Sequence, residues 1–354
     1  MTARRGKTKL EEGYGRGEAS IAAGDDVLIE QSALEKRLLE TFGAPDYQPP
    51  TLPAVATQLM SVSQRADVEI DEIVDLLQQD AMLAGKLMEL VASPLYAGAA
   101  KITSLRDAVM RVGMQNVRDL VMQVALNLRV FRVPAYSETM ERLRRHSVLT
   151  AHLSRIVSRY TPIESEYAFL CGLLHDVGVA GVLIALAEGT VRVPAKTKAR
   201  VTKAGKPDPP DLAAVWPEVD AVHGVAASQM SRLWGLPPEL AIAIGSHHQV
   251  LVEGYAHPLA ATICVADAEA QALGFGIVSS TSAESETEDV GIDADDAAIR
   301  AACMQSHHTA DHSTPATLGH ACDALGLDDP QLELIRKDAR EFVENWEEGG
   351  AADA

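Results

Sequence analysis

Residues 170–178 are Leu170-Cys171-Gly172-Leu173-Leu174-His175-Asp176-Val177-Gly178, which places a histidine and an aspartate side by side within an apolar run. An unpaired charge buried in such a run carries a heavy free-energy penalty, so both side chains need a partner. A shared metal ion is one such partner, because imidazole nitrogen and carboxylate oxygen both coordinate divalent cations. A His175–Asp176 pair hydrogen-bonded within a core is the other interpretation, and the rest of the chain has to decide between the two.

The same apolar run, from Tyr167 to Ala187, is long enough to cross a bilayer. His175 and Asp176 lie near its middle, which favours two buried helices that meet at Gly178 over a membrane span. At the N-terminus, basic residues are not followed by the apolar segment that a secretory signal requires. We therefore expect no membrane insertion.

Composition describes a soluble globular protein, with 47% hydrophobic and 23% charged residues in a chain of 354. The formal net charge of −19 argues against general binding to nucleic acid or to anionic membranes, because clustered Lys and Arg drive that binding. The four cysteines are widely spaced and form no CxxC pair. A thiol-rich zinc site or a disulfide framework is therefore not expected, and a cytoplasmic location fits.

Apolar residues recur at helical spacing along most of the chain, without strand-like alternation, which predicts an all-α fold. Asp80 is a candidate helix N-cap, and Pro134 marks a hinge between two helical halves. The expected organisation is a disordered tail at 1–27, a connector helix at 28–46, a helical domain at 47–276, an acidic disordered linker at 277–296, C-terminal helices at 297–346 and a tail at 347–354. Within 47–276 we expect a first lobe at 47–133 and a second at 134–276, which includes a basic loop at 191–211.

The second half carries polar residues in positions that otherwise face a core. A single histidine on an apolar helix face is more often a hydrogen-bonded core residue than a ligand. Here several such residues lie at the inner face or the end of different predicted helices, which together favour a metal site. The seven candidate ligands are His146, His175, Asp176, His223, His247, His248 and Asp267. Nitrogen and oxygen donors without thiolate suit a divalent Mn, Fe, Zn, Ni or Mg ion, without singling one out.

Two of these histidines, His247 and His248, are expected in the last turn of a helix that starts at Pro237-Pro238. His152 is expected to point away from the cluster. A second histidine group, in a Ser- and Thr-rich stretch without an apolar frame, is interpreted as surface polarity and comprises His307, His308, His312 and His320. The last helix is expected from Pro330 to Trp346.

The pattern as a whole resembles the HDOD domain, a relative of the HD and HD-GYP phosphohydrolases. The resemblance covers roughly residues 47–276 and the final helices. In the first half it rests on Leu52-Pro53, Asp80-Ala81-Met82-Leu83, Ser93-Pro94-Leu95-Tyr96 and the run from Ile102 to Gly113. In the second half it rests on His146-Ser147, the 172–178 stretch, His223-Gly224, Trp234-Gly235-Leu236-Pro237 and His247-His248. The resemblance implies a two-lobed all-helical domain with an HD-like second lobe.

The resemblance also assigns ligands. His146, His175, Asp176 and Asp267 match the metal-binding set of the HD superfamily, while His223 and His247, with its neighbour His248, match the histidines that complete a two-metal site in HD-GYP enzymes. Two departures matter. Val179 stands where active HD-GYP proteins have a lysine for the scissile phosphate, and the Gly-Tyr-Pro sequence beyond the double histidine is absent.

Two functions follow from this resemblance. The first is a bacterial signalling or regulatory module that acts by binding a protein partner or a ligand, such as a nucleotide, with a metal site but without efficient catalysis. The second is a metal-dependent phosphohydrolase or phosphodiesterase acting on a nucleotide or a cyclic dinucleotide. The missing lysine at Val179 favours the first, because a phosphoryl-transfer site needs a group that stabilises developing charge. The near-complete ligand set favours the second.

Overall fold

The structure is a computed structural model that describes residues 32–65, 67–96, 102–162, 166–191, 193, 209–252, 254–277 and 315–348. From Ser32 onward the described residues belong to one compact unit. The all-α prediction is confirmed, since helices dominate and the described strands form a single antiparallel pair, β1 (Leu251–Val252) and β2 (Tyr255–Ala256). This small hairpin was not predicted.

The first helical half comprises α2 (Ala54–Val62), α3 (Ile70–Gln78), α4 (Ala81–Val91), α5 (Leu105–Val112) and α6 (Met114–Arg129), together with a 3₁₀ turn, η1 (Pro94–Tyr96). The Asp80 carboxylate accepts hydrogen bonds from the backbone N–H groups of Met82 and Leu83, so the predicted N-cap is confirmed. Leu83, Leu87 and Leu90 then face the core at helical spacing. This half of the molecule is therefore held together by the packing of apolar helix faces. It contributes none of the seven candidate ligands.

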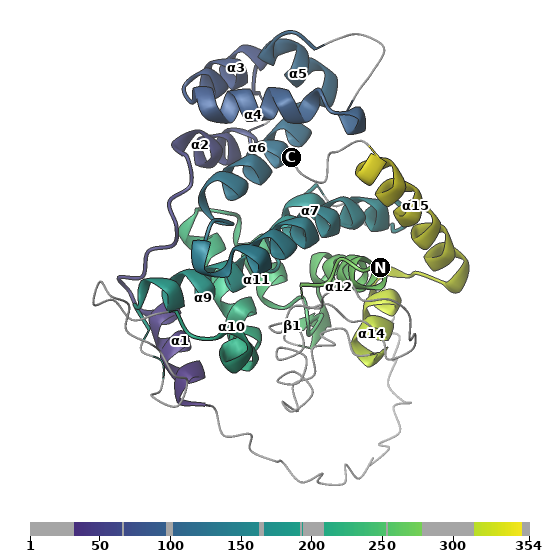
Figure 1. Ribbon diagram of the computed structural model, residues 1–354. Coiled ribbons are helices and arrows are strands. Elements are labelled where there is room, and N and C mark those ends of the chain that lie inside the picture. Colours follow the sequence, from purple (N-terminus) through teal and green to yellow (C-terminus); the bar gives the residue numbers. More distant parts are fainter. Residues whose placement is uncertain are drawn as a thin grey trace, which may run out of the picture. The chain divides into compact units, whose positions relative to one another are not determined.

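The second half is built around α7 (Ser137–Arg159), α8 (Ala168–Leu174), α9 (Val177–Glu188), α10 (Leu212–Leu233), α11 (Pro238–Gly245) and α12 (Pro258–Ala272). Helix α7 packs against α8 and α12, and α9 packs against α10 (Figure 1). Helix α1 (Ala33–Gly43), the described part of the expected connector, lies against α10. The ends of these helices therefore meet around the 170–178 stretch.

The apolar run at 168–188 is long enough to span a membrane, but 94% of its most apolar window is buried among the other helices of the protein. It is also interrupted, because α8 ends at Leu174 and α9 begins at Val177. His175 and Asp176 occupy the break. The run thus forms two buried helices, as predicted, but they meet at His175 and Asp176, and Gly178, the expected meeting point, lies inside α9.

Glycines on both sides of this break let neighbouring helices approach closely. A Cβ at Gly178 would collide with the backbone carbonyl of His223 and with the backbone nitrogen of Ala227, both on α10. A Cβ at Gly172 would collide with Ser154 and with the Thr150 carbonyl on α7. Only glycine permits both contacts, so these two residues fix the distances of α8 and α9 from the helices that carry His146 and His223.

The two halves are joined by a buried ionic network. Arg118 on α6 is completely buried and donates to the Asp119 carboxylate at 2.9 Å, while its terminal nitrogens reach the side chain and the carbonyl of Glu166 at 3.1 Å. Arg155 on α7 donates to the other oxygen of Asp119 at 2.6 Å. Because both charges of the Arg118–Asp119 pair are buried, losing one partner would leave the other uncompensated.

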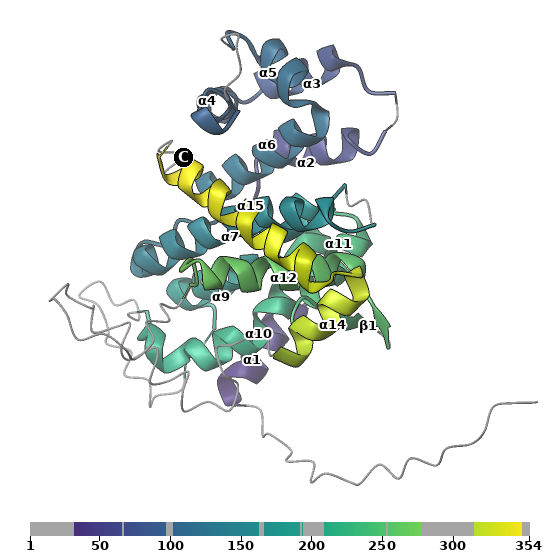
Figure 2. The ribbon, with the colours of Figure 1, turned by 90° about the vertical axis from the view of Figure 1, so that its right-hand side faces the viewer.

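The C-terminal part contains α14 (Pro315–Leu325) and α15 (Asp329–Glu348). The predicted last helix, 330–346, is confirmed with slightly wider bounds, and α14 lies within the stretch 297–346 in which C-terminal helices were expected. Figure 2 shows α15 crossing α7 and α12, and its Asp338 accepts hydrogen bonds from Arg159 and Tyr160 at the end of α7. The expected N-terminal tail, most of the basic loop and the acidic linker lie outside the described residues.

Candidate metal centre

The structure brings all seven predicted ligands into one connected cluster. His146 comes from α7, His175 and Asp176 from the break between α8 and α9, His223 from α10, and Asp267 from α12. His247 and His248 follow α11. That helix ends at Gly245, so the pair lies in the turn beyond it and the prediction that they share its last turn is wrong. All of these side chains are buried except His248, which is half-buried.

The turn that holds His247 and His248 ends in an unusual backbone conformation. Val250 has φ of 59°, in the left-handed region that a side chain branched at Cβ rarely adopts. Its N–H donates to the Ser246 carbonyl and its own carbonyl accepts from His257, both at 2.9 Å. These two bonds and the buried Val250 side chain hold the turn closed.

Four of the histidines are oriented through the same ring atom. The Nδ1 atoms of His175, His223 and His247 each lie within hydrogen-bond distance of the backbone carbonyl three residues earlier, at 2.8, 2.5 and 2.5 Å respectively. The Nδ1 atom of His146 lies 2.9 Å from the carbonyl of Phe275. A carbonyl only accepts, so each Nδ1 carries the proton and each Nε2 is directed to the cluster as a potential donor of electrons to a metal.

Asp176 lies between two pairs of these nitrogens. Its Oδ2 is 3.2 Å from Nε2 of His175 and 3.5 Å from Nε2 of His146. Its Oδ1 is 3.4 Å from Nε2 of His223 and 3.5 Å from Nε2 of His247. One carboxylate therefore faces two separate sets of imidazoles, so each of its oxygens could contribute to a different ligand group.

Two ligand groups result. One comprises His146, His175 and Asp176, with Asp267 Oδ1 3.2 Å from the His146 nitrogen, and the other comprises Asp176, His223, His247 and His248. We name them the His146 half and the His223 half. Asp267 aside, the candidate ligand atoms in each group lie within 4.8 Å of one another. The cluster could therefore hold metal ions on either side of Asp176.

Some buried nitrogen atoms of the cluster lack a suitable hydrogen-bond partner, which is consistent with a bound metal ion. The Nε2 of His247 is buried and has no hydrogen-bond partner among the described residues. Nε2 of His146 lies 3.1 Å from Nε2 of His175, a contact that is favourable only with a proton or a metal ion between the two nitrogens. Buried polar atoms normally find a partner, and a cation that accepts several lone pairs would supply one here.

Charge within the cluster is strongly coupled. Burial by itself would lower the pKa of His146, but the hydrogen bonds and charges of Asp176 and Asp267 outweigh it and raise that pKa to about 10. Burial would raise the pKa of Asp176, yet the charge of His175 and hydrogen bonds from the histidines hold it well below its usual range. Burial would also raise the pKa of Asp267, but the hydrogen bond from His146 and the charges of His146 and His175 outweigh it and lower that pKa to about 2. Both carboxylates are thus ionised, and a metal would displace a proton from His146.

Two contacts of the cluster escaped the sequence analysis. The Gln271 side-chain amide lies 3.1 Å from both oxygens of Asp267 and donates to them. Its position one helical turn after Asp267 is a signal that could have been found. The Phe275 carbonyl that accepts from His146 left no signal, because a backbone atom in a helix-terminating turn has no distinctive residue type.

The other histidines that the structure describes are not part of the cluster. His152 is buried between the rings of Phe169 and Phe342, with centroids 5.1 and 4.7 Å away. Of the second predicted group, His320 is exposed on α14, and His307, His308 and His312 lie outside the described residues.

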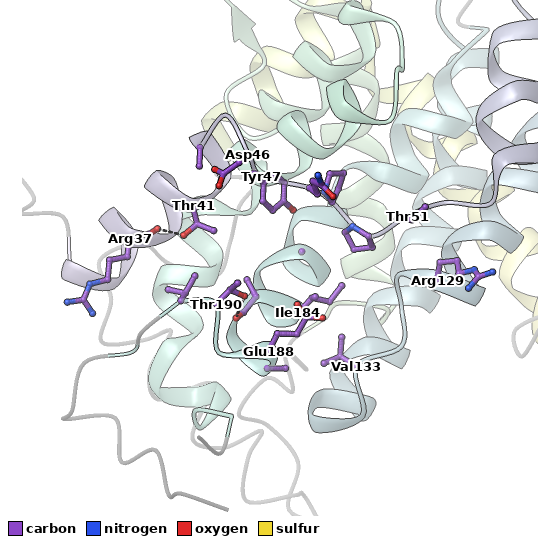
Figure 3. Close-up of a pocket in the computed structure, with 18 of the residues that line it drawn as sticks. Arg37, Thr41, Asp46, Tyr47, Thr51, Arg129, Val133, Ile184, Glu188 and Thr190 are labelled. Atoms are coloured by element: carbon purple, nitrogen blue, oxygen red, sulfur yellow. Dashed lines mark hydrogen bonds between the residues drawn. The ribbon is translucent and has the colours of Figure 1, made fainter. Parts of the chain in front are cut away.

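A separate pocket of about 1060 Å³ lies at the far end of α9, and none of the seven ligands lines it. Its walls come from α1, the proline-containing segment 44–51, the end of α6 and the end of α9. In Figure 3, Arg37 and Arg129 lie at opposite ends, with Tyr47 and Ile184 between them. The lining also includes Arg132 and the acidic Glu40, Asp46 and Glu188, so it carries charges of both signs.

Comparison with known proteins places these features in context. Residues 50–250, more than half of the chain, match the family model of the HDOD domain. An uncharacterized protein of Treponema pallidum (strain Nichols) is 24% identical over 222 residues, which represent 62% of this chain and 41% of that protein. This chain therefore spans about two fifths of the length of that relative.

Solved structures share the fold at low sequence identity. An HDOD domain protein of unknown function from Geobacter sulfurreducens is 22% identical with a TM-score of 0.59, covering 90% of this chain and 97% of that one. A Shewanella amazonensis SB2B protein provisionally named a phosphohydrolase is 20% identical, with a TM-score of 0.57 and coverage of 90% and 98%. A Marinobacter aquaeolei VT8 protein provisionally named for signal transduction is 17% identical, with a TM-score of 0.52 and coverage of 90% and 65%.

Proposed function

Because the chain belongs to the HDOD domain family, we propose that it is a bacterial signalling or regulatory module that acts by binding a protein partner or a ligand. In this proposal the His/Asp cluster is a metal centre that shapes the second half of the molecule and does not support efficient catalysis. The provisional signal-transduction name of the Marinobacter neighbour is consistent with this role. We propose a cytoplasmic location, which the absence of CxxC pairs supports.

His146, His175, Asp176 and Asp267 would hold one divalent ion, and Asp176, His223, His247 and His248 would hold a second. The donor set admits Mn, Fe, Zn, Ni or Mg, since it offers imidazole and carboxylate without thiolate. Such an ion supplies Lewis acidity and can lower the pKa of a bound water. The carbonyls that accept from the four Nδ1 atoms hold the imidazoles in position to receive it.

One observation carries the choice of binding over turnover. Among the described residues, the ion pairs of Asp176 and Asp267 all come from histidines, with neither Lys nor Arg among their partners. Val179, at the position where active relatives are expected to have lysine, is an apolar side chain only 3% exposed. The described part of the chain therefore places no fixed cation at the site to stabilise charge on a phosphoryl group, and removing one such group typically costs about 10²–10³ in rate.

The test is a turnover assay on purified protein loaded with Mn, Fe or Zn and offered cyclic dinucleotides, nucleoside triphosphates and deoxynucleotides. We expect no sustained turnover above the level of the Asp176→Ala variant, which removes the shared carboxylate. A Val179→Lys variant restores a cation at the missing position and is the matched gain-of-function arm. Sustained hydrolysis by the native chain that disappears in Asp176→Ala would contradict the binding proposal.

That contradictory result would establish the second candidate, a metal-dependent phosphohydrolase or phosphodiesterase acting on a nucleotide or cyclic dinucleotide. The observation favouring it is the completeness of two ligand groups that share one carboxylate. The provisional name of the Shewanella neighbour agrees with this alternative. In this case Asp176 would bridge the two halves, and cations of the 191–211 segment would have to replace the missing lysine.

A protein partner is the binding target that we favour, with a nucleotide as the other candidate. The first helical half holds none of the seven ligands, yet the buried Arg118–Asp119–Arg155 network connects it to α7, which carries His146. A partner held by the first half could thereby respond to the state of the second. Binding to nucleic acid in general is not proposed, because the net charge of −19 opposes it.

A further inference from the structure

The backbone carbonyl that accepts a hydrogen bond from Nδ1 of His146 belongs to a distant part of the chain, unlike the carbonyls that accept from the other three histidines. His175, His223 and His247 each use a carbonyl three residues earlier in their own segment, so their orientation is local. His146 uses the carbonyl of Phe275, which is 129 residues away in the sequence. The direction of the His146 ring therefore depends on tertiary structure that the other three do not need.

The Phe275 carbonyl is placed by the end of α12. Gly274 adopts φ of +87°, and the Phe275 N–H donates to the Ala270 carbonyl at 3.0 Å, which closes the helix with a Schellman-type turn. The turn reverses the chain immediately after the helix that carries Asp267. The turn brings the Phe275 carbonyl to His146. The Phe275 ring is then contacted by side chains of other helices.

Two side chains hold that ring. The guanidinium of Arg145, the neighbour of His146, lies 5.2 Å from the centre of the Phe275 ring. The buried indole of Trp346, near the end of α15, lies 5.6 Å from it on a tilted plane. Arg145 also pairs with Glu347 at 3.6 Å, so two neighbouring residues of α15 contact the ring and the cation beside it, Trp346 the ring and Glu347 the cation.

Helix α15 is itself anchored independently of these contacts. Arg336 donates to Glu269 on α12 at 3.2 Å, and Asp338 accepts from Tyr160 at 2.8 Å and from Arg159 at 3.2 Å. All of α15 lies beyond residues 50–250, which match the family model. A segment outside the family module thus supports one ligand of the centre.

We propose that Phe275 and Trp346 are positioning residues for the His146 half of the metal centre, so that docking of α15 controls metal affinity in that half alone. The inference rests on the proposed metal centre. It makes α15 a control element, because anything that lifts α15 away frees Phe275 and releases the Nδ1 proton of His146 to water. The His223 half is unaffected, since its Nδ1 atoms bond to carbonyls of their own segments.

The test compares the native chain with Trp346→Ala and Phe275→Ala by titrating each protein with Zn²⁺ and with Co²⁺. Loss of a contact to a ligating histidine typically lowers metal affinity about 10- to 100-fold. We expect a loss in that range at one of two metal positions and unchanged affinity at the other. Trp346→Phe, which keeps an aromatic ring, is expected to restore most of the affinity. Leu77→Ala, which truncates a buried leucine on α3 in the ligand-free half, is the control for loss of packing and should change neither position.

A second readout does not require metal. In the metal-free protein the Nδ1 proton of His146 is shielded by the Phe275 carbonyl, so its exchange with water should be slow by NMR and at least tenfold faster in Trp346→Ala. Equal exchange in both proteins, equal weakening of both metal positions, or two unchanged positions in Trp346→Ala would each overturn the inference. A native chain that binds no metal contradicts the proposed centre, while the exchange measurement still decides the role of Trp346.

Discussion

At the scale of single residues, the cluster depends on which ring nitrogen of each histidine holds a proton. Backbone carbonyls accept from four Nδ1 atoms, and the remaining nitrogens surround one aspartate. The sequence was sufficient to nominate the seven side chains, because histidine and aspartate are rare on apolar helix faces. It could not nominate the carbonyls, which belong to residues of any type. Gln271 was not predicted, although its position one helical turn after Asp267 can be read from the sequence.

His152 illustrates a buried histidine that is not a ligand, and its environment predicts a pH effect. Burial, with a smaller contribution from Arg155, lowers the pKa of His152 to about 3. The unfolded chain has an ordinary histidine pKa of about 6.5. Between pH 3 and 6.5 only the unfolded state binds this proton, so the contribution is complete above pH 6.5 and is lost as the pH falls through that window.

The measurement is urea unfolding of the native chain and of His152→Gln between pH 7 and pH 4. The free energy of unfolding of the native chain should fall more steeply, by up to about 1.4 kcal/mol per pH unit, because one extra proton is taken up on unfolding. The other histidines are common to both proteins and cancel in the comparison. Parallel pH profiles would show that His152 is already accessible to protons in the folded state.

At the scale of elements, the spacing of apolar residues predicted the helices. It did not predict the features that depend on an unusual backbone conformation. The helices around Leu83 and around His146 follow from apolar spacing, and both were predicted. The β1–β2 hairpin and the end of α11 at Gly245 were not. Both depend on the turn that ends at Val250, and a valine with positive φ contradicts the local preference on which sequence reasoning relies. At Val250, burial of the side chain in the core outweighs the local preference of valine for negative φ.

Gly178 tests the packing of α9 on α10. In Gly178→Ala the new methyl group would meet the His223 carbonyl and the Ala227 nitrogen, so the two helices must separate. Overpacking of this kind typically costs about 1–3 kcal/mol. The displacement of α10 should also weaken metal binding in the His223 half. Chemical unfolding and metal titration measure the two effects.

The matched control is Gly85→Ala on the exposed side of α4, where a Cβ would meet nothing within 4 Å. Replacing an exposed helix-interior glycine by alanine typically stabilises by about 1 kcal/mol. The two substitutions should therefore change the free energy of unfolding in opposite directions. A Gly178→Ala variant that is as stable as the native chain, or more stable, would mean that Gly178 is not confined by α10.

At the scale of the whole molecule, two helical halves of different chemistry are joined by a buried network of charges. The first half has an apolar core and no candidate ligand, and the second half encloses the His/Asp cluster. The all-helical fold and the family membership follow from long stretches of sequence, so they were predictable. The ionic network between the halves was not predictable, because Arg118 lies 48 residues from its partner Glu166 and Asp119 lies 36 residues from its partner Arg155, and all of them look like ordinary surface charges in the sequence.

The central claim is that the cluster is a metal centre bridged by Asp176, and metal content measures it directly. Protein purified without chelator and then loaded with Mn, Fe or Zn should hold two ions per chain by elemental analysis. Asp176→Ala, which removes the only carboxylate shared by both ligand groups, should lose both ions. His320→Ala, an exposed histidine outside the cluster, is the control and should retain them. A native chain that takes up no metal, or an Asp176→Ala variant that still holds two ions, would contradict the account.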